Sequence, residues 1–480
     1  RQGKDPNEKK MTKPEITPII TNRDVASPFL VEVQESAVKP IEPVFLDYQK
    51  DMSQLKAKSD IPVLYKQNVA NDLFQLIYVF DMGNNHDKAL GTAFDYLEYL
   101  GTSDMTPEEL KSEFYRLACT FYVSPGNERT YVVLSGLNEN MPAAVQLFEK
   151  LLADAQVNKE AYTNMTSDIL KARSDAKLNQ GQNFSRLMSF AMYGPKSPAT
   201  NLLTEAELTN MNPQELVDRI HNQNSYKHRI LYYGPSSSKD LLATINQYHQ
   251  VPATLKDIPA GNEYAYLETP VTKVLVAPYD AKQIYMAQIS NLDKKYDPAI
   301  EPIRALYDEY FGGGMNSIVF QEMRETRGLA YSAWASIMPP SYLKYPYVLR
   351  TQIATQNDKM IDAVTTFNDI INNMPESEAA FKLAKDGLTN RLRTERIIKG
   401  DIIWSYINAQ DLGQNVDPRI KLYNDIQNMS LKDIVDFQKQ WVKGRTYVYY
   451  ILGDKKDLEL DKLKAVGPIE ELTQEQIFGY

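Results

Sequence analysis

The chain has 480 residues, 43% of them hydrophobic and 24% charged, which is ordinary for a globular protein of about two domains. Its 53 basic and 62 acidic side chains give a net charge of −9, which argues against binding to nucleic acids or to anionic membranes. The single cysteine, Cys119, excludes an intrachain disulfide and leaves both a reducing and an extracytoplasmic compartment open. No run of about 18 apolar residues predicts a membrane span.

Residues 1–60 are rich in Lys, Pro, Glu and Asp, and prolines interrupt their short apolar runs. Such a composition cannot build a core of its own, so it predicts an extended linker or hinge segment. The sequence starts at Arg1 without a methionine and without the apolar stretch of a signal peptide. We therefore expect it to continue a longer polypeptide.

A first α+β domain is predicted over residues 61–262 from the order of its apolar runs. The runs 61–66 and 73–80 are expected to form a hairpin-like pair of strands. Further strands are predicted at 119–123, 129–137 and 229–233. Helices are predicted at 86–100, 107–116, 140–154, 158–178, 183–192, 213–223 and 238–248.

The second half, residues 263–480, repeats this order. Its strands are predicted at 271–277, 283–290, 332–338, 347–355 and 446–452, and its helices at 298–311, 358–373, 376–398, 401–411 and 430–442. The closing segments HRILYYGPSSSKDLLATI at 228–245 and TYVYYILGDKKDLELDKL at 446–463 align at an offset of 218 (446 − 228). The sequence therefore predicts a duplicated α+β module, each copy an antiparallel sheet covered by helices.

The stretch GGGMNSIVFQEMRETRGLAY, residues 312–331, combines a glycine-rich loop with an amphipathic run. Gly312, Gly313 and Gly314 permit positive φ or a close approach to another segment. In the helix predicted after them, apolar side chains can face a core, namely Ile318, Val319, Met323 and Leu329. Arg324 and Tyr331 lie seven positions apart (331 − 324) and are expected near one end of this helix.

This stretch resembles the signature of the last domain of M16 (pitrilysin-type, inverzincin) metallopeptidases, where a Gly-rich turn precedes a helix ending in an Arg-Glu-x-x-Gly-x-x-Tyr-like segment. The matching residues are Gly312, Gly313, Gly314, Phe320, Gln321, Arg324, Glu325, Gly328, Leu329 and Tyr331. The resemblance covers about 61–480 and implies two tandem homologous LuxS/MPP-like metallohydrolase domains. Residues 1–60 resemble the hinge between the halves of two-half M16 enzymes.

The first domain departs from the family at its zinc motif. In active M16 enzymes the first helix carries His-x-x-Glu-His, with two imidazoles for Zn²⁺ and a glutamate as general base. The matching positions here are Asp95, Glu98 and Tyr99. Aspartate binds a metal weakly, and neutral tyrosine does not bind it. We therefore expect neither a metal nor a catalytic residue in this chain, and zinc in the N-terminal half or partner subunit.

Other catalytic devices are not predicted. None of the four histidines, His86, His221, His228 and His249, pairs with another at i+4, so structural or surface roles are expected. Cys119 lies in a predicted strand and is expected to be a buried core thiol. Nucleophile-elbow and Walker patterns are absent from the sequence.

The residues and the resemblance together predict the non-zinc-binding half of an M16-type metallopeptidase, inactive alone. It would close on a zinc-bearing partner half, from the same precursor or a separate subunit, and hold a substrate peptide through Arg324, Tyr331 and Gly312 to Gly314. The alternatives are a catalytically silent scaffold or core subunit with the M16 fold and a stand-alone peptide-binding module. Resemblance to long secreted bacterial M16 enzymes implies a periplasmic or otherwise extracytoplasmic location, with the cytoplasm as the alternative.

Overall fold

The computed structural model describes residues 27–37, 39–280, 283–454 and 456–480 and divides the chain into two compact units, Arg1–Glu42 and Pro43–Tyr480. The first unit contains helix α1 (Pro28–Glu35). Ser27 caps this helix by accepting the Leu30 N–H at 3.2 Å, and Pro28 occupies its first turn. Within the predicted linker, residues 28–35 are therefore helical rather than extended, and residues 1–26 lie outside the described residues.

The second unit begins at Pro43 rather than at Ile61. Leu46, Tyr48 and Met52 are buried, and strand β1 (Ser53–Lys56) pairs antiparallel with β2 (Pro62–Gln67). Residues 43–60 therefore bury apolar side chains in the compact unit. The prolines and charges of this segment did not predict that burial. We call residues 43–262 module 1 and residues 263–480 module 2.

Module 1 contains a six-stranded sheet in the order β1-β2-β6-β3-β5-β4. Its other strands are β3 (Leu73–Phe80), β4 (Cys119–Pro125), β5 (Thr130–Leu137) and β6 (Arg229–Gly234). Its helices are α2 (Leu90–Leu97), α3 (Pro107–Arg116), α4 (Met141–Asp154), α5 (Lys159–Lys177), α6 (Gln180–Tyr193), α7 (Glu205–Asn210), α8 (Gln214–Asn222) and α9 (Ser238–Tyr248).

Module 2 contains a second six-stranded sheet in the order β12-β7-β11-β8-β10-β9. The strands are β7 (Lys273–Pro278), β8 (Gln283–Lys295), β9 (Ser332–Met338), β10 (Pro346–Gln356), β11 (Val448–Gly453) and β12 (Ile469–Glu471). The α-helices are α10 (Glu301–Phe311), α11 (Ile318–Phe320), α12 (Met360–Asn372), α13 (Glu378–Thr394), α14 (Asp401–Asp411), α15 (Pro418–Ile426), α16 (Leu431–Trp441), α17 (Leu460–Leu463) and α18 (Gln474–Phe478), and a π-helix spans Gln321–Thr326.

The duplication predicted from the sequence is confirmed strand by strand, because β2-β6-β3-β5-β4 corresponds to β7-β11-β8-β10-β9. Two details differ from expectation. The strands β2 and β3 do not form a hairpin, since β6 lies between them and pairs with both. The pairs β2–β6 and β7–β11 are parallel, so each sheet is mixed rather than purely antiparallel. In both modules the closing strand returns after a long helical connection, which permits parallel pairing.

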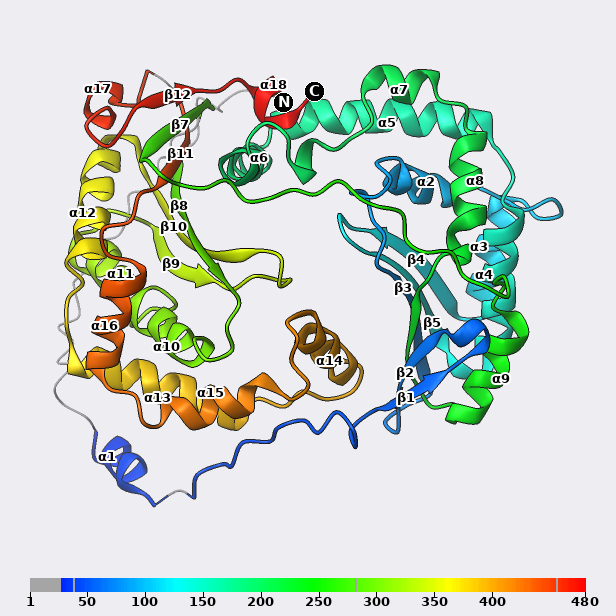
Figure 1. The fold of residues 1–480 in the computed structure, drawn as a ribbon, viewed down its shortest axis with the longest axis horizontal. Coiled ribbons are helices and arrows are strands. Elements are labelled where there is room, and N and C mark those ends of the chain that lie inside the picture. The colour runs from blue at the N-terminus through cyan, green and yellow to red at the C-terminus, as the bar shows by residue number, and fades with distance from the viewer. Residues whose placement is uncertain (1–26, 38, 281–282, 455) are drawn as a thin grey trace, which may run out of the picture. The chain divides into compact units, whose positions relative to one another are not determined.

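The two modules contact each other through packing and charge. Helix α6 of module 1 lies beside β11 and β8 of module 2 (Figure 1), where Phe184 contacts the ring of Tyr450 at 5.3 Å between centroids. Arg129, at the start of β5, donates two hydrogen bonds of 2.6 Å to Asp411 of α14. Among the residues that the structure describes, no helix is long and apolar enough to cross a membrane.

Candidate functional site

The glycine-rich loop follows α10 directly and is held by backbone hydrogen bonds. The N–H groups of Gly312 and Gly313 both donate to the carbonyl of Asp308, at 3.0 and 2.7 Å. A Cβ atom on Gly312 would lie 2.3 Å from the Ala335 carbonyl oxygen in β9, whereas one on Gly314 would meet no atom within 4 Å. Gly312 is therefore needed for close packing against β9, and Gly313 and Gly314 are exposed.

The helix predicted after the loop is not a continuous α-helix. Ser317 caps α11 by accepting the Phe320 N–H, and after one turn the backbone continues as the π-helix. The apolar face is as predicted, because Ile318, Val319 and Met323 are buried. The helix ends before Gly328, whose φ of +57° turns the chain so that the Leu329 N–H donates to the Met323 carbonyl at 2.9 Å.

This geometry brings Arg324 and Tyr331 together. The guanidinium carbon of Arg324 lies 5.7 Å from the centroid of the Tyr331 ring and 4.9 Å from that of Phe320. Both functional groups face solvent, since the Arg324 side chain is 44% exposed and Tyr331 is 74% exposed. The arrangement presents a planar cation, stacked on aromatic rings, beside a phenol hydroxyl.

The turn that carries Tyr331 is held by β10 and by the N-cap residue of α12. Thr355 donates its hydroxyl to the Leu329 carbonyl at 2.5 Å, and Lys359 donates to the Gly328 carbonyl at 3.0 Å. The Tyr331 N–H donates to the Ala354 carbonyl at 3.0 Å, which begins the pairing of β9 with β10. The backbone of this site is thus bonded to rigid elements, while the Arg324 and Tyr331 side chains remain open to a ligand.

The matching corner of module 1 does not fit a zinc ion. Helix α2 ends at Leu97 and Glu98 is its C-cap, and the Tyr99 N–H donates to the Tyr96 carbonyl at 3.0 Å, so the last turn is tighter than the regular α-helical turn of a zinc helix. Asp95 lies at an exposed position, yet partial desolvation and then the Glu98 charge raise its pKa. Within the described residues, no group of three His, Cys, Asp or Glu side chains is arranged to hold a metal.

Glu98 instead lies at the rim of an apolar pocket of about 740 Å³ between α3 and β4, whose lining includes Phe114, Cys119 and Phe121. Cys119 is buried, as predicted, and burial raises the pKa of its thiol. A protonated thiol is a poor nucleophile, so the residue has a packing role.

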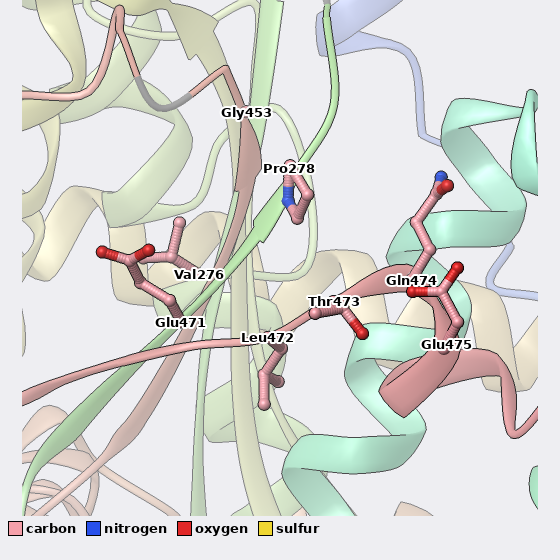
Figure 2. A pocket seen from close by; sticks show the side chains of 8 residues that line it. All are labelled: Val276, Pro278, Gly453, Glu471, Leu472, Thr473, Gln474 and Glu475. Atoms are coloured by element: carbon pink, nitrogen blue, oxygen red, sulfur yellow. The ribbon is translucent and has the colours of Figure 1, made fainter.

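A second pocket, of about 480 Å³, lies where the chain passes from β12 into α18 (Figure 2). Its polar side chains already have partners. The Thr473 hydroxyl accepts the Gln476 N–H at 3.2 Å, and Gln474 donates to the Lys177 carbonyl at 2.8 Å. Glu475 pairs with Lys177 at 3.5 Å. This pocket lies at the contact between α18 and the module 2 sheet, and its polar side chains have structural roles.

One buried polar cluster escaped the sequence analysis. His228 and His249, which were assigned separate structural roles, lie with their Nε2 atoms 2.8 Å apart, and His249 Nδ1 lies 2.6 Å from Glu149. The three residues are far apart in sequence and show no ligand spacing, so only the fold reveals the contact.

Comparison with known proteins agrees with the signature in module 2. Residues 230–388 match the family described as "Peptidase M16 inactive domain". Over this segment, about a third of its length, the chain resembles the M16 peptidase family. A non-peptidase homolog, YmxG of Helicobacter pylori, is 23% identical to this chain over 422 residues, which cover 83% of this chain and 93% of the relative.

Two solved structures share the fold. The peptidase M16 inactive domain from Pseudomonas fluorescens has a TM-score of 0.65 at 15% identity, covering 84% of this chain and 98% of that one. The periplasmic protease PqqL from Escherichia coli has a TM-score of 0.67 at 13% identity, covering 93% of this chain but only 49% of that one. The present chain therefore spans about half of the E. coli protease.

Proposed function

We propose that this chain is the non-zinc-binding half of an M16-type metallopeptidase and forms one shell of a closed, peptide-degrading chamber. The partner is a zinc-bearing M16 half, from the same precursor or a separate subunit. Two observations support the proposal: the chain spans about half of the E. coli protease, and its own zinc-motif positions do not fit a metal. The resemblance to two-half M16 enzymes likewise favours a partner half.

The observation that carries the proposal is the Arg324–Tyr331 pair. Its guanidinium offers several N–H donors in one plane, and stacking on Phe320 and Tyr331 holds that plane in place. Tyr331 directly precedes β9, the last strand in the sheet order of module 2, and Arg324 of the π-helix lies over its ring. An extended peptide passing this edge would present backbone carbonyls to the two donors.

The chemistry divides between the two halves. Zinc in the partner half would supply the activated water. Arg324 and the Tyr331 hydroxyl bind and orient the scissile peptide, and their N–H and O–H groups stabilise the negative charge that develops on the attacked carbonyl oxygen. Gly314 leaves the loop open beside this surface, whereas Gly312 packs against the backbone of β9 and Gly313 against that of α10.

The test is hydrolysis of a fluorogenic peptide by this chain combined with its zinc-bearing half. We expect Arg324→Ala to lower kcat/KM by about 100-fold, as for loss of one oxyanion donor. Arg327→Ala is the matched control, since Arg327 lies one residue beyond the same π-helix, is also 44% exposed, and pairs with Glu322 at 3.5 Å. It should change kcat/KM by less than about twofold, because a surface ion pair contributes little.

Tyr331→Phe separates the hydroxyl from the ring. It should lower kcat while the chain keeps its stability, because the ring remains beneath Arg324. Equal turnover by wild type and Arg324→Ala would remove the proposed role. Zinc bound stoichiometrically to the isolated chain, measured by elemental analysis, would contradict the division between halves.

The second candidate function is a catalytically silent scaffold. It is favoured by the H. pylori relative described as a non-peptidase homolog, whose length the match almost completely covers. In that case the chain would form stable complexes, yet no combination with a partner would cleave peptides. We further propose an extracytoplasmic location, supported by the fold shared with the periplasmic E. coli protease.

A further inference from the structure

The core of module 1 contains a chain of three ionisable side chains with almost no solvent exposure. Glu149 of α4 is 1% exposed, His249 after α9 is 0% exposed, and His228 before β6 is 7% exposed. Nδ1 of His249 lies 2.6 Å from Glu149, and the two Nε2 atoms lie 2.8 Å apart. Nδ1 of His228 lies 2.7 Å from the carbonyl oxygen of Tyr226.

Donors and acceptors along this chain can be assigned from its ends. A backbone carbonyl only accepts, so His228 carries a hydrogen on Nδ1. Oε2 of Glu149 accepts hydrogen bonds from the Asn224 side chain at 2.9 Å and the Gln250 N–H at 3.0 Å, as an ionised carboxylate does. Oε1 then accepts from Nδ1–H of His249. Both Nδ1 atoms are used as donors, which leaves two Nε2 lone pairs facing each other at 2.8 Å.

We propose that one proton is bound between Nε2 of His228 and Nε2 of His249, with the Glu149 carboxylate as its counter-ion. The bound proton turns a repulsive contact between two acceptors into an N–H···N hydrogen bond. It also gives the buried Glu149 carboxylate a positive partner, without which the charge would be strongly destabilising. The cluster is neutral overall and joins the segments after α9 and before β6 to helix α4.

The distance favours a proton over a metal ion. Two imidazole nitrogens bound to one tetrahedral zinc at about 2.0–2.1 Å each would be about 3.3 Å apart. The observed 2.8 Å is shorter and suits a hydrogen bond.

The surrounding groups support a single proton on the pair. Burial, and then the neighbouring His249, lowers the pKa of His228 to about 3, so His228 is the neutral acceptor. Burial and Glu149 raise the pKa of Tyr78, whose ring packs on His249 at 4.4 Å, so this phenol stays uncharged. The remaining charges near His228 are paired with each other, Arg229 with Asp81 and Lys227 with Asp257.

His228 also lines a cavity of about 800 Å³, which gives the proton a route to solvent. The site can therefore follow the pH of the medium. Above the ordinary histidine pKa of about 6.5, the unfolded chain holds no proton on these histidines and the folded chain holds one, so stability falls as pH rises. Below it the unfolded chain holds two and the folded chain one, because the pKa of His228 is depressed, so stability falls as pH drops.

The direct test is ¹⁵N NMR of the imidazole rings in the full chain at pH 6 to 8. The chain has only four histidines, so single substitutions assign every ring. We expect both His228 and His249 to be protonated at Nδ1 and to share one proton at Nε2, seen as a strongly deshielded resonance. Two unprotonated Nε2 atoms at pH 7 would overturn the proposal, as would one equivalent of zinc or copper on the pair by elemental analysis.

The second test measures proton linkage. The folding equilibrium constant of wild type should change by up to tenfold per pH unit from this site, with opposite signs on the two sides of about pH 6.5. The triple variant Glu149→Leu/His228→Leu/His249→Leu should lose this contribution, whereas the exposed His221→Gln variant should retain it. Identical pH profiles for the triple variant and wild type would contradict the proposal, and if the triple variant does not fold, the wild-type NMR spectrum decides.

Discussion

The corner of module 1 that carries Asp95 and Glu98 and the corner of module 2 that carries Arg324 are built on the same plan but differ in length. A capped helix leads into the edge strand in both. From cap to strand the chain uses 13 positions in module 1 (Thr106 to Cys119) and 15 in module 2 (Ser317 to Ser332). The longer connection contains the π-helix and the Gly328 turn, which display Arg324 and Tyr331. The two extra residues of module 2 thus belong to the segment whose π-helix and turn expose Arg324 and Tyr331.

The shared features of the two corners hold the fold. A Cβ atom on Gly101 would lie 2.3 Å from the Met105 carbonyl oxygen, as one on Gly312 would from that of Ala335. A tyrosine of the first helix also holds the start of the long helix in each module. The Asn158 N–H donates to the Tyr96 hydroxyl at 2.8 Å, and that of Ser377 donates to Tyr310 at 3.0 Å.

The largest expected effect comes from adding a methyl group at Gly312, where the loop packs directly against the backbone of β9. The obstacle to a methyl group is the backbone of β9, which cannot rotate away as a side chain can. We expect Gly312→Ala to lower the free energy of unfolding by about 3 kcal/mol, the upper part of the range for overpacking. Urea unfolding followed by circular dichroism would measure it.

Gly314→Ala is the matched control in the same loop, since its Cβ would meet no atom within 4 Å. It should change stability by less than about 0.5 kcal/mol. If Gly101→Ala destabilises as Gly312→Ala does, the glycine has the same packing role in both corners. A harmless Gly312→Ala would mean that β9 can move away from the loop.

A substitution at Asp308 of α10 is expected to change stability by an intermediate amount that depends on pH. Burial raises its pKa to about 6, although Arg304 and the Ile337 N–H act in the opposite direction. Its ordinary pKa is about 3.8, so between these values the folded state holds a proton that the unfolded state has lost. The contribution of Asp308 to the free energy of unfolding therefore falls as pH rises from 4 to 6. Above pH 6 the destabilisation from the buried carboxylate is complete.

Asp308→Asn should remove that cost while retaining an acceptor for the Ile337 N–H, which now donates to Asp308 at 2.9 Å. Relative to wild type, the variant should gain about 2 kcal/mol more in free energy of unfolding at pH 7 than at pH 4. This figure allows for the weakened bond to Arg304. Unfolding curves of wild type and variant at several pH values would show it. Parallel profiles would mean that Asp308 titrates normally in the fold.

Much of this architecture could be predicted because it depends on local signals. The runs 73–80 and 332–338 are strands with the predicted bounds, and Thr106-Pro107 begins α3 where a capping residue and proline predict a helix. The pairing of β2 with β6 could not be predicted, since it depends on a contact across the whole module. The short α7 and α15 were missed because their polar sequences show little amphipathic pattern.

The sequence predicted that Arg324 and Tyr331 lie near one end of a helix, but not the shape of the backbone between them. The spacing of Arg324 and Tyr331 indicated proximity, yet the π-helix that sets their separation has no distinct sequence pattern. The buried cluster of Glu149, His228 and His249 left no trace at all, because its members come from three elements that only the tertiary fold brings together.

The smallest expected effect concerns the corner of module 1. Restoring the motif with Asp95→His/Tyr99→His should not create a zinc site, because position 99 follows the C-cap of α2 in a tightened turn, where its N–H donates to the Tyr96 carbonyl. A tetrahedral site also needs further ligands, and no such group is arranged among the described residues. We expect less than about 0.1 zinc per chain by elemental analysis, with unchanged stability in the presence of zinc. Stoichiometric zinc in this variant would instead mean that the corner has kept the metal-binding geometry and lost only its ligands, and the comparison between the modules would then rest on residue identity rather than on helix length.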